Sequence, residues 1–349
     1  MFVRPFVPRN PFKLTQTTER VRRFIKKFNG VPSISKIKPT KTFLEFWEND
    51  PSEAYGTFQL AFRDGRICNI RFNSKNGQFH ALYLDRYAFG YEPEVCGALD
   101  ALLLPHGAFY DIGANWGYFP LFVVSGGFQG DIITFEPNPR AHLDLQQIIK
   151  EAGVSSSVRS YECALSHFNG VGSMTLPHPL YSGLTTIQEN TVGISVPCTR
   201  TEVNLQKLDD LVVANSLPFP DLMKIDAEDA EYDVIRGASN VIKSSRPIII
   251  FENWADLGKY QQALDPLKML EQYNYALFIL GWRVPALGQI ITSDNKALDL
   301  SLGKGHGVEL ALIPFRSHQR FLYGSKTNCI AVHPDKQALV EKSFTYLTD

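Results

Sequence analysis

The chain has 349 residues, of which 44% are hydrophobic and 20% are charged, values typical of a folded protein and not of a disordered one. No apolar run approaches the ~20 residues that a membrane-spanning helix needs. The five cysteines are too widely spaced for a zinc site or a disulfide framework, which favours a reducing, cytoplasmic location. The length allows one large domain with an extension.

The net charge of −1 conceals a strongly basic N-terminal arm. Residues 1–41 hold eleven Lys and Arg against one acid, Glu19, so the arm carries +10 and the remaining chain −11. Apolar residues at helical spacing within the arm predict a short basic amphipathic helix. Such a helix can contact an anionic membrane or an acidic partner, act as an organellar presequence, or pack on its own domain. The apolar face consists of Val21, Phe24, Ile25 and Phe28.

After the arm and its linker, residues 42–106 predict an α+β extension, and residues 107–349 alternate strands with helices. This alternation is typical of a parallel sheet covered on both faces. The extension contains expected strands at 67–72 and 79–84 and a helix at 92–104. Expected strands of the main domain are 108–110, 132–135, 158–162, 222–226, 247–251, 275–280 and 328–332. Expected helices include 138–153, 205–213, 230–238, 265–272 and one from 335, with a hairpin insertion at 168–200.

The turn after residue 110 carries the strongest functional signal: Asp111-Ile112-Gly113-Ala114-Asn115-Trp116-Gly117. Its glycines let the backbone approach a ligand closely, and Asn115 is expected to cap the next helix. A dinucleotide would bring its pyrophosphate to this turn, where Asp111 would repel it. S-adenosylmethionine instead carries an ammonium and a sulfonium, which a carboxylate attracts. We therefore expect Asp111, Gly113, Asn115 and Gly117 to contact a methyl donor.

Two later strand ends extend this expected site. Glu136 lies 25 residues after Asp111, close to the offset of ~20 residues for an acid that accepts from ribose hydroxyls. Cys163 and Ala164 follow the next strand, where a backbone amide and an apolar side chain can hold adenine, although ordinary packing explains them almost as well.

Several segments together resemble the FkbM family of S-adenosylmethionine-dependent methyltransferases. The resemblance implies a class I methyltransferase fold, Rossmann-like and doubly wound, with a mostly parallel seven-stranded sheet. It implies transfer to a hydroxyl, often on a sugar or a secondary-metabolite scaffold, and it adds Glu92 and Asn138 to the expected cofactor-binding residues. Asp229 departs from the family, which usually has glycine there. The matching segments are Tyr91-Glu92-Pro93-Glu94-Val95, Asp111 to Gly117, Phe135-Glu136-Pro137-Asn138-Pro139, Leu222 to Glu231 and, more weakly, Glu252.

Methyl transfer to an alkyl hydroxyl needs a base, and three residues are candidates for it: Asp226, His167 and His178. Asp226 is also expected beside the donor. It begins an acidic run, Asp226-Ala227-Glu228-Asp229-Ala230-Glu231, which can equally stabilise a helix start through the helix dipole. A divalent cation held by part of this run with Glu252 is an open alternative, but no metal-loop spacing is present and no metal is predicted.

The leading hypothesis is O-methylation of a sugar, glycan or small metabolite. The alternatives are a methyltransferase for a macromolecule recruited by the basic arm, a donor-binding scaffold without turnover, and a dinucleotide-dependent oxidoreductase. The last is disfavoured by Asp111 and by the missing third glycine of the dinucleotide fingerprint.

Overall fold

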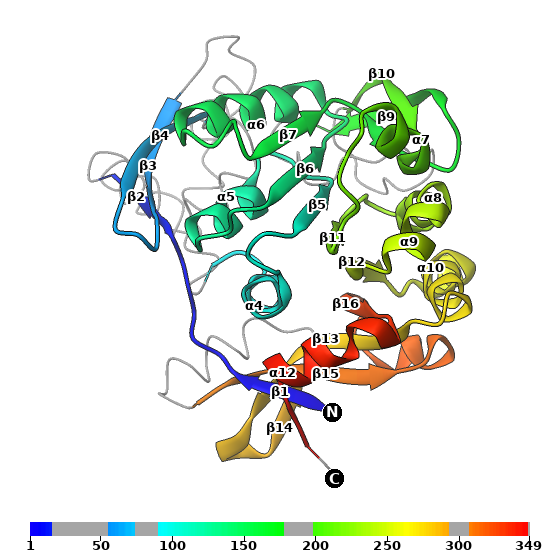
Figure 1. Cartoon of the computed structure of the whole chain (residues 1–349). Helices are drawn as coiled ribbons and strands as arrows, with labels where there is room; N and C mark the ends of the chain where they lie inside the picture. The colour runs from blue at the N-terminus through cyan, green and yellow to red at the C-terminus, as the bar shows by residue number, and fades with distance from the viewer. Residues whose placement is uncertain (16–54, 74–89, 178–197, 293–306, 348–349) are drawn as a thin grey trace, which may run out of the picture.

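The computed structural model describes residues 1–15, 55–73, 90–177, 198–292 and 307–347 (Figure 1). The expected amphipathic helix at 21–28 and the expected strand at 79–84 lie outside these ranges. None of the described helices combines the length and the apolar character that a membrane crossing requires.

One large sheet organises the chain. Its strands are β1 (Phe2–Pro5), β5 (Ala108–Ile112), β6 (Asp131–Phe135), β7 (Val158–Tyr161), β11 (Leu222–Ile225), β12 (Ile248–Trp254), β13 (Ala276–Val284), β14 (Gln289–Ile291), β15 (Glu309–Phe315), β16 (Lys326–Val332) and β17 (Thr345–Tyr346). Within the described ranges these eleven strands lie in the order β17-β1-β15-β13-β16-β12-β11-β5-β6-β7, with β14 on β13. Neighbours from β7 to β12 are parallel, whereas β16 and the strands beyond it pair antiparallel.

This order confirms the expected Rossmann-like arrangement, as a mixed sheet with a parallel core. All seven expected strands of the main domain are present, from β7 across to β13. The expected strand number is wrong, because β14, β15, β1 and β17 extend the sheet beyond β13. β1 comes from the first residues of the predicted basic arm and pairs with β15. The proposed domain boundaries at residues 41 and 106 stay a prediction.

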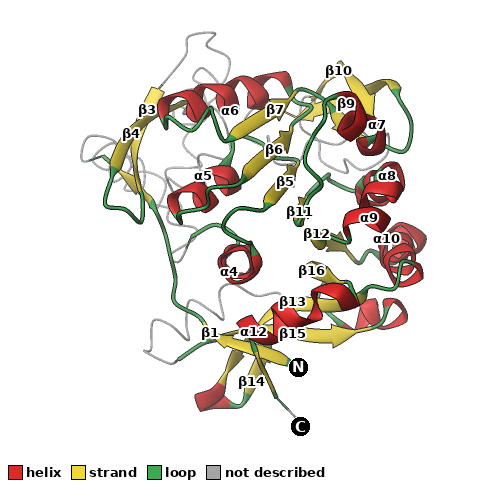
Figure 2. Cartoon of the chain, in the orientation of Figure 1, coloured by secondary structure: helices red, strands yellow, loops and turns green. Residues whose placement is uncertain are grey.

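Helices cover both faces of the sheet (Figure 2). One layer contains α4 (Pro93–Leu102), α5 (Tyr118–Ser125), α6 (Pro139–Glu151) and α12 (Gln337–Ser343). The other contains α7 (Leu208–Ala214), α8 (Glu231–Gly237), α9 (Ser239–Ser245) and α10 (Tyr260–Gln272). Alternate residues of a strand serve the two layers: Leu222 packs in the first core and Met223 in the second.

Two smaller sheets flank the main one. β2 (Phe12–Leu14), β3 (Tyr55–Ala61) and β4 (Ile67–Asn73) form the first. The expected hairpin insertion forms the second, in which β9 (Gly170–Pro177) pairs with β10 (Cys198–Gln206), and β10 pairs with β8 (Ala164–Leu165). The helix expected to start at residue 205 starts instead at Leu208, because β10 continues to Gln206. The helix expected at 265–272 is longer and begins at Tyr260.

Candidate functional site

The turn between β5 and α5 has the tight geometry that its glycines predict. Gly113 has a φ of +79°, and a Cβ there would lie 1.8 Å from the backbone oxygen of Asp226, so only glycine fits. Gly117, with a φ of +94°, is the N-cap of α5. The expectation that Asn115 caps this helix is therefore wrong. Asn115 sits at a left-handed φ of 46°, and its Oδ1 is buried without a hydrogen-bond partner among the described residues.

Glu136, at the end of β6, lies directly beside this turn. Its Oε2 accepts from the backbone N–H of Asn115 and its Oε1 from that of Asn138, both at 2.8 Å. Asn138 caps α6 through a bond from the N–H of Arg140 to its own Oδ1. Burial raises the pKa of Glu136 to about 7, although these two backbone bonds oppose the rise. The two backbone bonds fix the carboxylate, and each oxygen keeps a lone pair for a ligand hydroxyl.

Charged side chains line the α4-facing side of the strand ends. Asp111 of β5 pairs in register with Lys224 of β11, and Asp226 lies two residues further along on the same side. The Nζ of Lys224 is 3.1 Å from Asp226 Oδ2 and 3.9 Å from Asp111 Oδ1. Lys224 is 4% exposed and Asp111 is fully buried. Both oxygens of Asp111 and Oδ1 of Asp226 lack a hydrogen-bond partner in the described part of the chain.

We call Asp111, Lys224 and Asp226 the charged row. Burial is the main influence on the pKa values of Asp111 and Lys224. It raises the pKa of Asp111 to about 6, with Lys224 opposing the rise and Asp226 adding to it. Burial alone would lower the pKa of Lys224, but Asp226 and Asp111 together hold it above its ordinary value, so Lys224 remains a cation. A protonated Lys224 cannot act as a base. Its ammonium instead lies 3.1 Å from Oδ2 of Asp226 and holds that side chain in place.

The start of α4 closes the row from above. Glu92 is the N-cap, at a left-handed φ of 42°, and its Oε2 is buried without a partner among the described residues. Burial raises its pKa to about 8; Lys224 opposes this, whereas Asp226 and Glu252 add to it. The charged groups that affect the pKa of Glu92 include Lys224, Asp226 and Glu252, which lie at the strand ends. That this segment covers a bound donor stays a prediction.

The β11–α8 junction holds the rest of the acidic run. Glu228 and Asp229 have left-handed φ values of 48° and 77°, which explains why glycine suits the position of Asp229. Asp229 bonds Lys259 at 2.6 Å, before α10. The Glu231 carboxylate accepts from the N–H of Ala227, as a helix-start residue does. Burial raises the pKa of Glu228 to about 10, with Asp226 and Glu252 adding to the rise.

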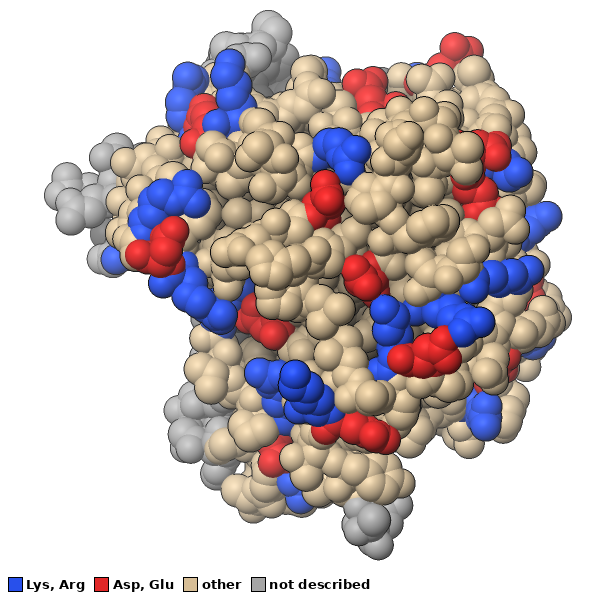
Figure 3. All heavy atoms as spheres, viewed as in Figure 1, with Lys and Arg blue, Asp and Glu red and all other residues tan. Residues whose placement is uncertain are grey.

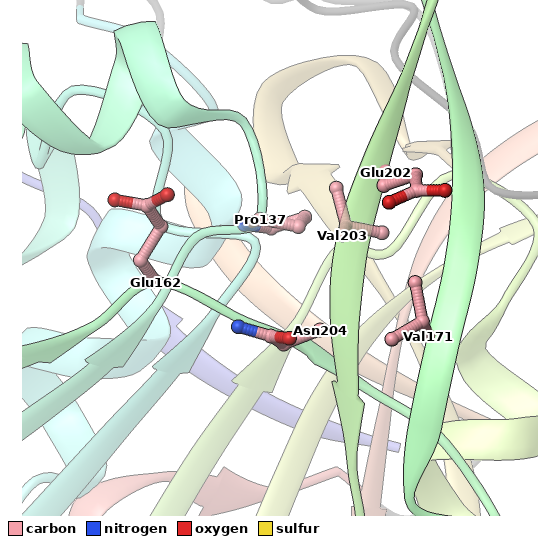
Figure 4. Close-up of a pocket in the computed structure, with 6 residues that line it drawn as sticks. All are labelled: Pro137, Glu162, Val171, Glu202, Val203 and Asn204. Atoms are coloured by element: carbon pink, nitrogen blue, oxygen red, sulfur yellow. The ribbon is translucent and has the colours of Figure 1, made fainter.

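The expected adenine residues lie at the edge of the site. Cys163 is buried, and burial raises the pKa of its thiol to about 12, so it is a neutral packing group. Ala164 begins β8 and packs against the hairpin. A pocket of about 140 Å³ opens between the hairpin and the loop after Glu136 (Figure 4). Its lining residues are Pro137, Glu162, Val171, Glu202, Val203 and Asn204.

The candidate bases Asp226 and His167 lie on different sides of the sheet. Asp226 is in the charged row, whereas Nδ1 of His167 is 2.9 Å from Asp233 of α8, on the opposite helical layer. His178 lies outside the described residues. Sequence reasoning did not single out Lys224, Lys326 or Trp254. The two-residue period of β11 and β12 was the available signal, since it places Lys224 with Asp226 and Trp254 with Glu252.

The arrangement suits a cationic ligand. Glu92, Asp111 and Asp226 offer buried, unpartnered oxygens, while the nearby cation, Lys224, already contacts two carboxylates. The ammonium and sulfonium of S-adenosylmethionine fit such a surface. On the face that Figure 3 shows, Lys/Arg and Asp/Glu side chains are interspersed. Among the described residues, no group of three or more His, Cys, Asp or Glu side chains is arranged to hold a metal ion.

Comparison with known proteins gives a match to one family model over part of the chain. Residues 111–277 match the Methyltransferase FkbM domain. "Methyltransferase 1" of Beauveria bassiana (strain ARSEF 2860) is 28% identical over 142 residues, which cover 36% of this chain and 56% of that protein. "Methyltransferase sdnD" of Sordaria araneosa is 25% identical over 184 residues, covering 46% of this chain and 71% of that protein. The matched region thus spans little more than half of the first relative.

Among solved structures, the methyltransferase FkbM of Methylobacillus flagellatus KT aligns with a TM-score of 0.36 and 14% identity. The alignment covers 60% of this chain and 45% of that one. The fibrillarin of Aeropyrum pernix, solved with natively bound S-adenosyl-L-methionine, aligns with a TM-score of 0.34 and 11% identity, over 75% of this chain and 98% of that one.

Proposed function

Because residues 111–277 match the Methyltransferase FkbM domain, we propose that this chain transfers the methyl group of S-adenosylmethionine to a hydroxyl. The acceptor is a sugar, a glycan or another small metabolite. One observation carries the proposal. Asp226, held beside Lys224, directs a buried and unpartnered oxygen into the same row as Asp111.

In this proposal the residues of the site contact different parts of the donor. The bound donor supplies a methyl group activated by its positively charged sulfur. Asp111 and Glu92 attract the cationic groups of the donor, and Glu136 accepts from its ribose hydroxyls. Cys163 and Ala164 lie beside its adenine. Because displacement at carbon depends on alignment, these contacts mainly orient the donor toward the acceptor oxygen.

Asp226 then removes the proton of the acceptor hydroxyl as that oxygen attacks. Lys224 supports this role, because its ammonium lies 3.1 Å from Oδ2 of Asp226 and so orients the carboxylate. Asp226 Oδ1 has no hydrogen-bond partner among the described residues and is the oxygen that takes the proton. His167, paired with Asp233, has less support as the base.

Donor binding gives the direct test. S-adenosylhomocysteine should bind at micromolar strength by calorimetry, whereas nicotinamide dinucleotides should not bind. Glu136→Ala should weaken the binding by ~1–3 kcal/mol, because it removes charge-assisted hydrogen bonds to ribose.

The control uses the ligand, since Glu136 also fixes Asn115 and Asn138. Against the 2′,3′-dideoxy form of S-adenosylhomocysteine, wild type and Glu136→Ala should bind with similar affinity. An equal loss for both ligands would mean that Glu136 only shapes the turn, and tight NAD binding would contradict the proposed function itself.

A further inference from the structure

The charged row continues past Asp226, away from the donor residues. On β12, Glu252 and Trp254 follow in the same alternation, and they pair in register with Asn328 and Lys326 of β16. Side chains two residues apart on a strand, and side chains of paired residues, point to the same face. The row therefore runs from Asp111 on β5 to Lys326 on β16. The proposed donor contacts lie toward β5 and β6, and the β12–β16 end has no assigned role.

Trp254 occupies that end in a fixed orientation. Its indole N–H donates to Oε2 of Glu252 at 2.5 Å, and Glu252 is itself 4% exposed. Lys326 bonds the other oxygen of Glu252 at 2.5 Å, and its Nζ lies 4.9 Å from the centre of the Trp254 ring. The polar edge of the indole is thus tied to a buried carboxylate, which limits its rotation.

The ring itself remains accessible. Trp254 is 40% exposed, whereas Trp116 and Trp282 are 3% and 2% exposed. An exposed indole forgoes the stabilisation that burial of so large an apolar surface would give. Holding the indole in the open by a hydrogen bond to a buried carboxylate therefore favours a binding role over a packing role.

Arg320 fixes the segment that carries Trp254. This fully buried side chain donates from Nε to Oδ1 of Asn253 and from Nη2 to the Asn253 carbonyl. It also donates to the carbonyls of Gly324 and Ser325, just before β16. Arg320 therefore links the end of β12 to the segment before β16, and these hydrogen bonds hold the backbone next to Trp254 in place.

The chemistry of this corner indicates its ligand. An indole face attracts the C–H face of a pyranose ring, while the surrounding carboxylate oxygens accept from ring hydroxyls. We propose that Trp254 is the platform of the acceptor subsite, that it stacks on a sugar ring, and that Glu252 and Lys326 position its indole. A sugar lying on Trp254 directs one hydroxyl along the row toward Asp226. This inference rests on the proposed function and specifies its substrate class.

Tryptophan fluorescence of the full-length protein saturated with S-adenosylhomocysteine tests the proposal. The probes are the methyl glycosides of glucose, galactose, mannose and rhamnose. At least one should change the emission in a saturable way, and Trp254→Phe should remove that change. By calorimetry, Trp254→Ala should weaken binding of the same glycoside by about tenfold or more, and S-adenosylhomocysteine affinity should stay as in wild type.

The matched control is Phe219→Ala. Phe219 is 53% exposed but precedes β11, at the opposite end of the strands, so its loss should leave glycoside binding unchanged. Glu252→Gln weakens the contacts that orient the indole but keeps the indole itself. This variant should bind the glycoside more weakly than wild type and should bind S-adenosylhomocysteine with unchanged affinity.

Other outcomes contradict the inference in distinct ways. If Trp254→Ala binds the glycoside as wild type does, Trp254 is not the platform. If no glycoside binds while phenol quenches Trp254, the subsite takes an aromatic acceptor and the sugar class is wrong. If none of these probes binds, the acceptor subsite lies elsewhere. Failure of wild type to bind S-adenosylhomocysteine would instead contradict the proposed function.

Discussion

Replacing Asp226 with asparagine should lower kcat by about 10²–10⁴-fold, while the affinity for S-adenosylhomocysteine changes little. Asparagine keeps the shape of the side chain but cannot take the acceptor proton. An interaction that matters mainly in the transition state appears in kcat and not in ground-state binding. The measurement is methyl transfer to a glycoside that binds at Trp254, with calorimetry on the same protein.

The control for this change is Asp233→Asn on α8. It removes the charge that pairs with His167 and leaves the row untouched, so activity should persist. If Asp226→Asn is fully active and Asp233→Asn is not, His167 replaces Asp226 as the base. If both are active, Glu252 and His178 become the candidates.

The same assay distinguishes a base from a metal ion. A chelator should leave the wild-type rate unchanged if Asp226 acts directly. Loss of activity with chelator, followed by recovery with Mg²⁺ or Mn²⁺, would assign the acidic run and Glu252 to a hard cation with oxygen ligands.

The donor-free protein should lose stability as the pH rises from 6.5 to 8. In the folded state, burial raises the pKa of Glu136 to about 7 and those of Glu92 and Glu231 to about 8, all from 4.5. The folded protein therefore binds more protons than the unfolded chain in this range. A raised carboxyl stabilises the folded state fully below its unfolded pKa and loses that effect as the pH passes its folded pKa.

Urea unfolding at pH 6.5 and pH 8 measures this effect. A shift of one pKa unit on one group corresponds to about 1.4 kcal/mol of unfolding free energy. The fall in unfolding free energy from the three groups together should therefore be easily detected. His142 and His333, whose pKa values are lowered by burial, have an effect of the opposite sign, but most of that effect falls below this window. Glu231→Gln should reduce the slope, and saturating S-adenosylmethionine should flatten it by supplying cations. A stability that is constant or rising over this range would contradict the raised pKa values of these three buried carboxyl groups.

The sequence was sufficient for those parts of the site that depend on strand ends. Asp111, Glu136 and Asp226 each follow a short, mostly apolar run that reads as a buried strand, and parallel strands bring such ends to one edge. Gly113 and Gly117 were recognisable because their positions demand a positive φ. Glu92 was found only through a family motif, since its own surroundings signal a helix start.

Other parts depend on contacts between distant residues and left no local trace. The pairing of Phe2–Pro5 with Glu309–Phe315 joins opposite ends of the chain, so no local pattern could indicate it. The residue type of Asn115 predicted a helix cap, but its N–H donates to Glu136, and the N-cap of the helix is Gly117, two residues later. The exposure of Trp254 could not be inferred either, because an apolar strand end normally predicts burial.

The basic N-terminal arm carries two strands that pair with other parts of the fold. β1 pairs with β15 and β17, and β2 pairs with β3. Residues 16–54 therefore connect two paired strands, and both of their ends are anchored. Deleting the chain up to residue 38 would remove two strands along with the positive charge.

A polypeptide divided by design within residues 16–54 should consequently behave as a complementing pair. The short N-terminal piece retains the partners of β1 and β2, so co-expressed pieces should copurify and bind S-adenosylhomocysteine together. The larger piece alone would expose the edges of β15 and β3 and should aggregate, as unpaired sheet edges do. Size-exclusion chromatography of the two preparations would distinguish a built-in component of the fold from a dispensable leader.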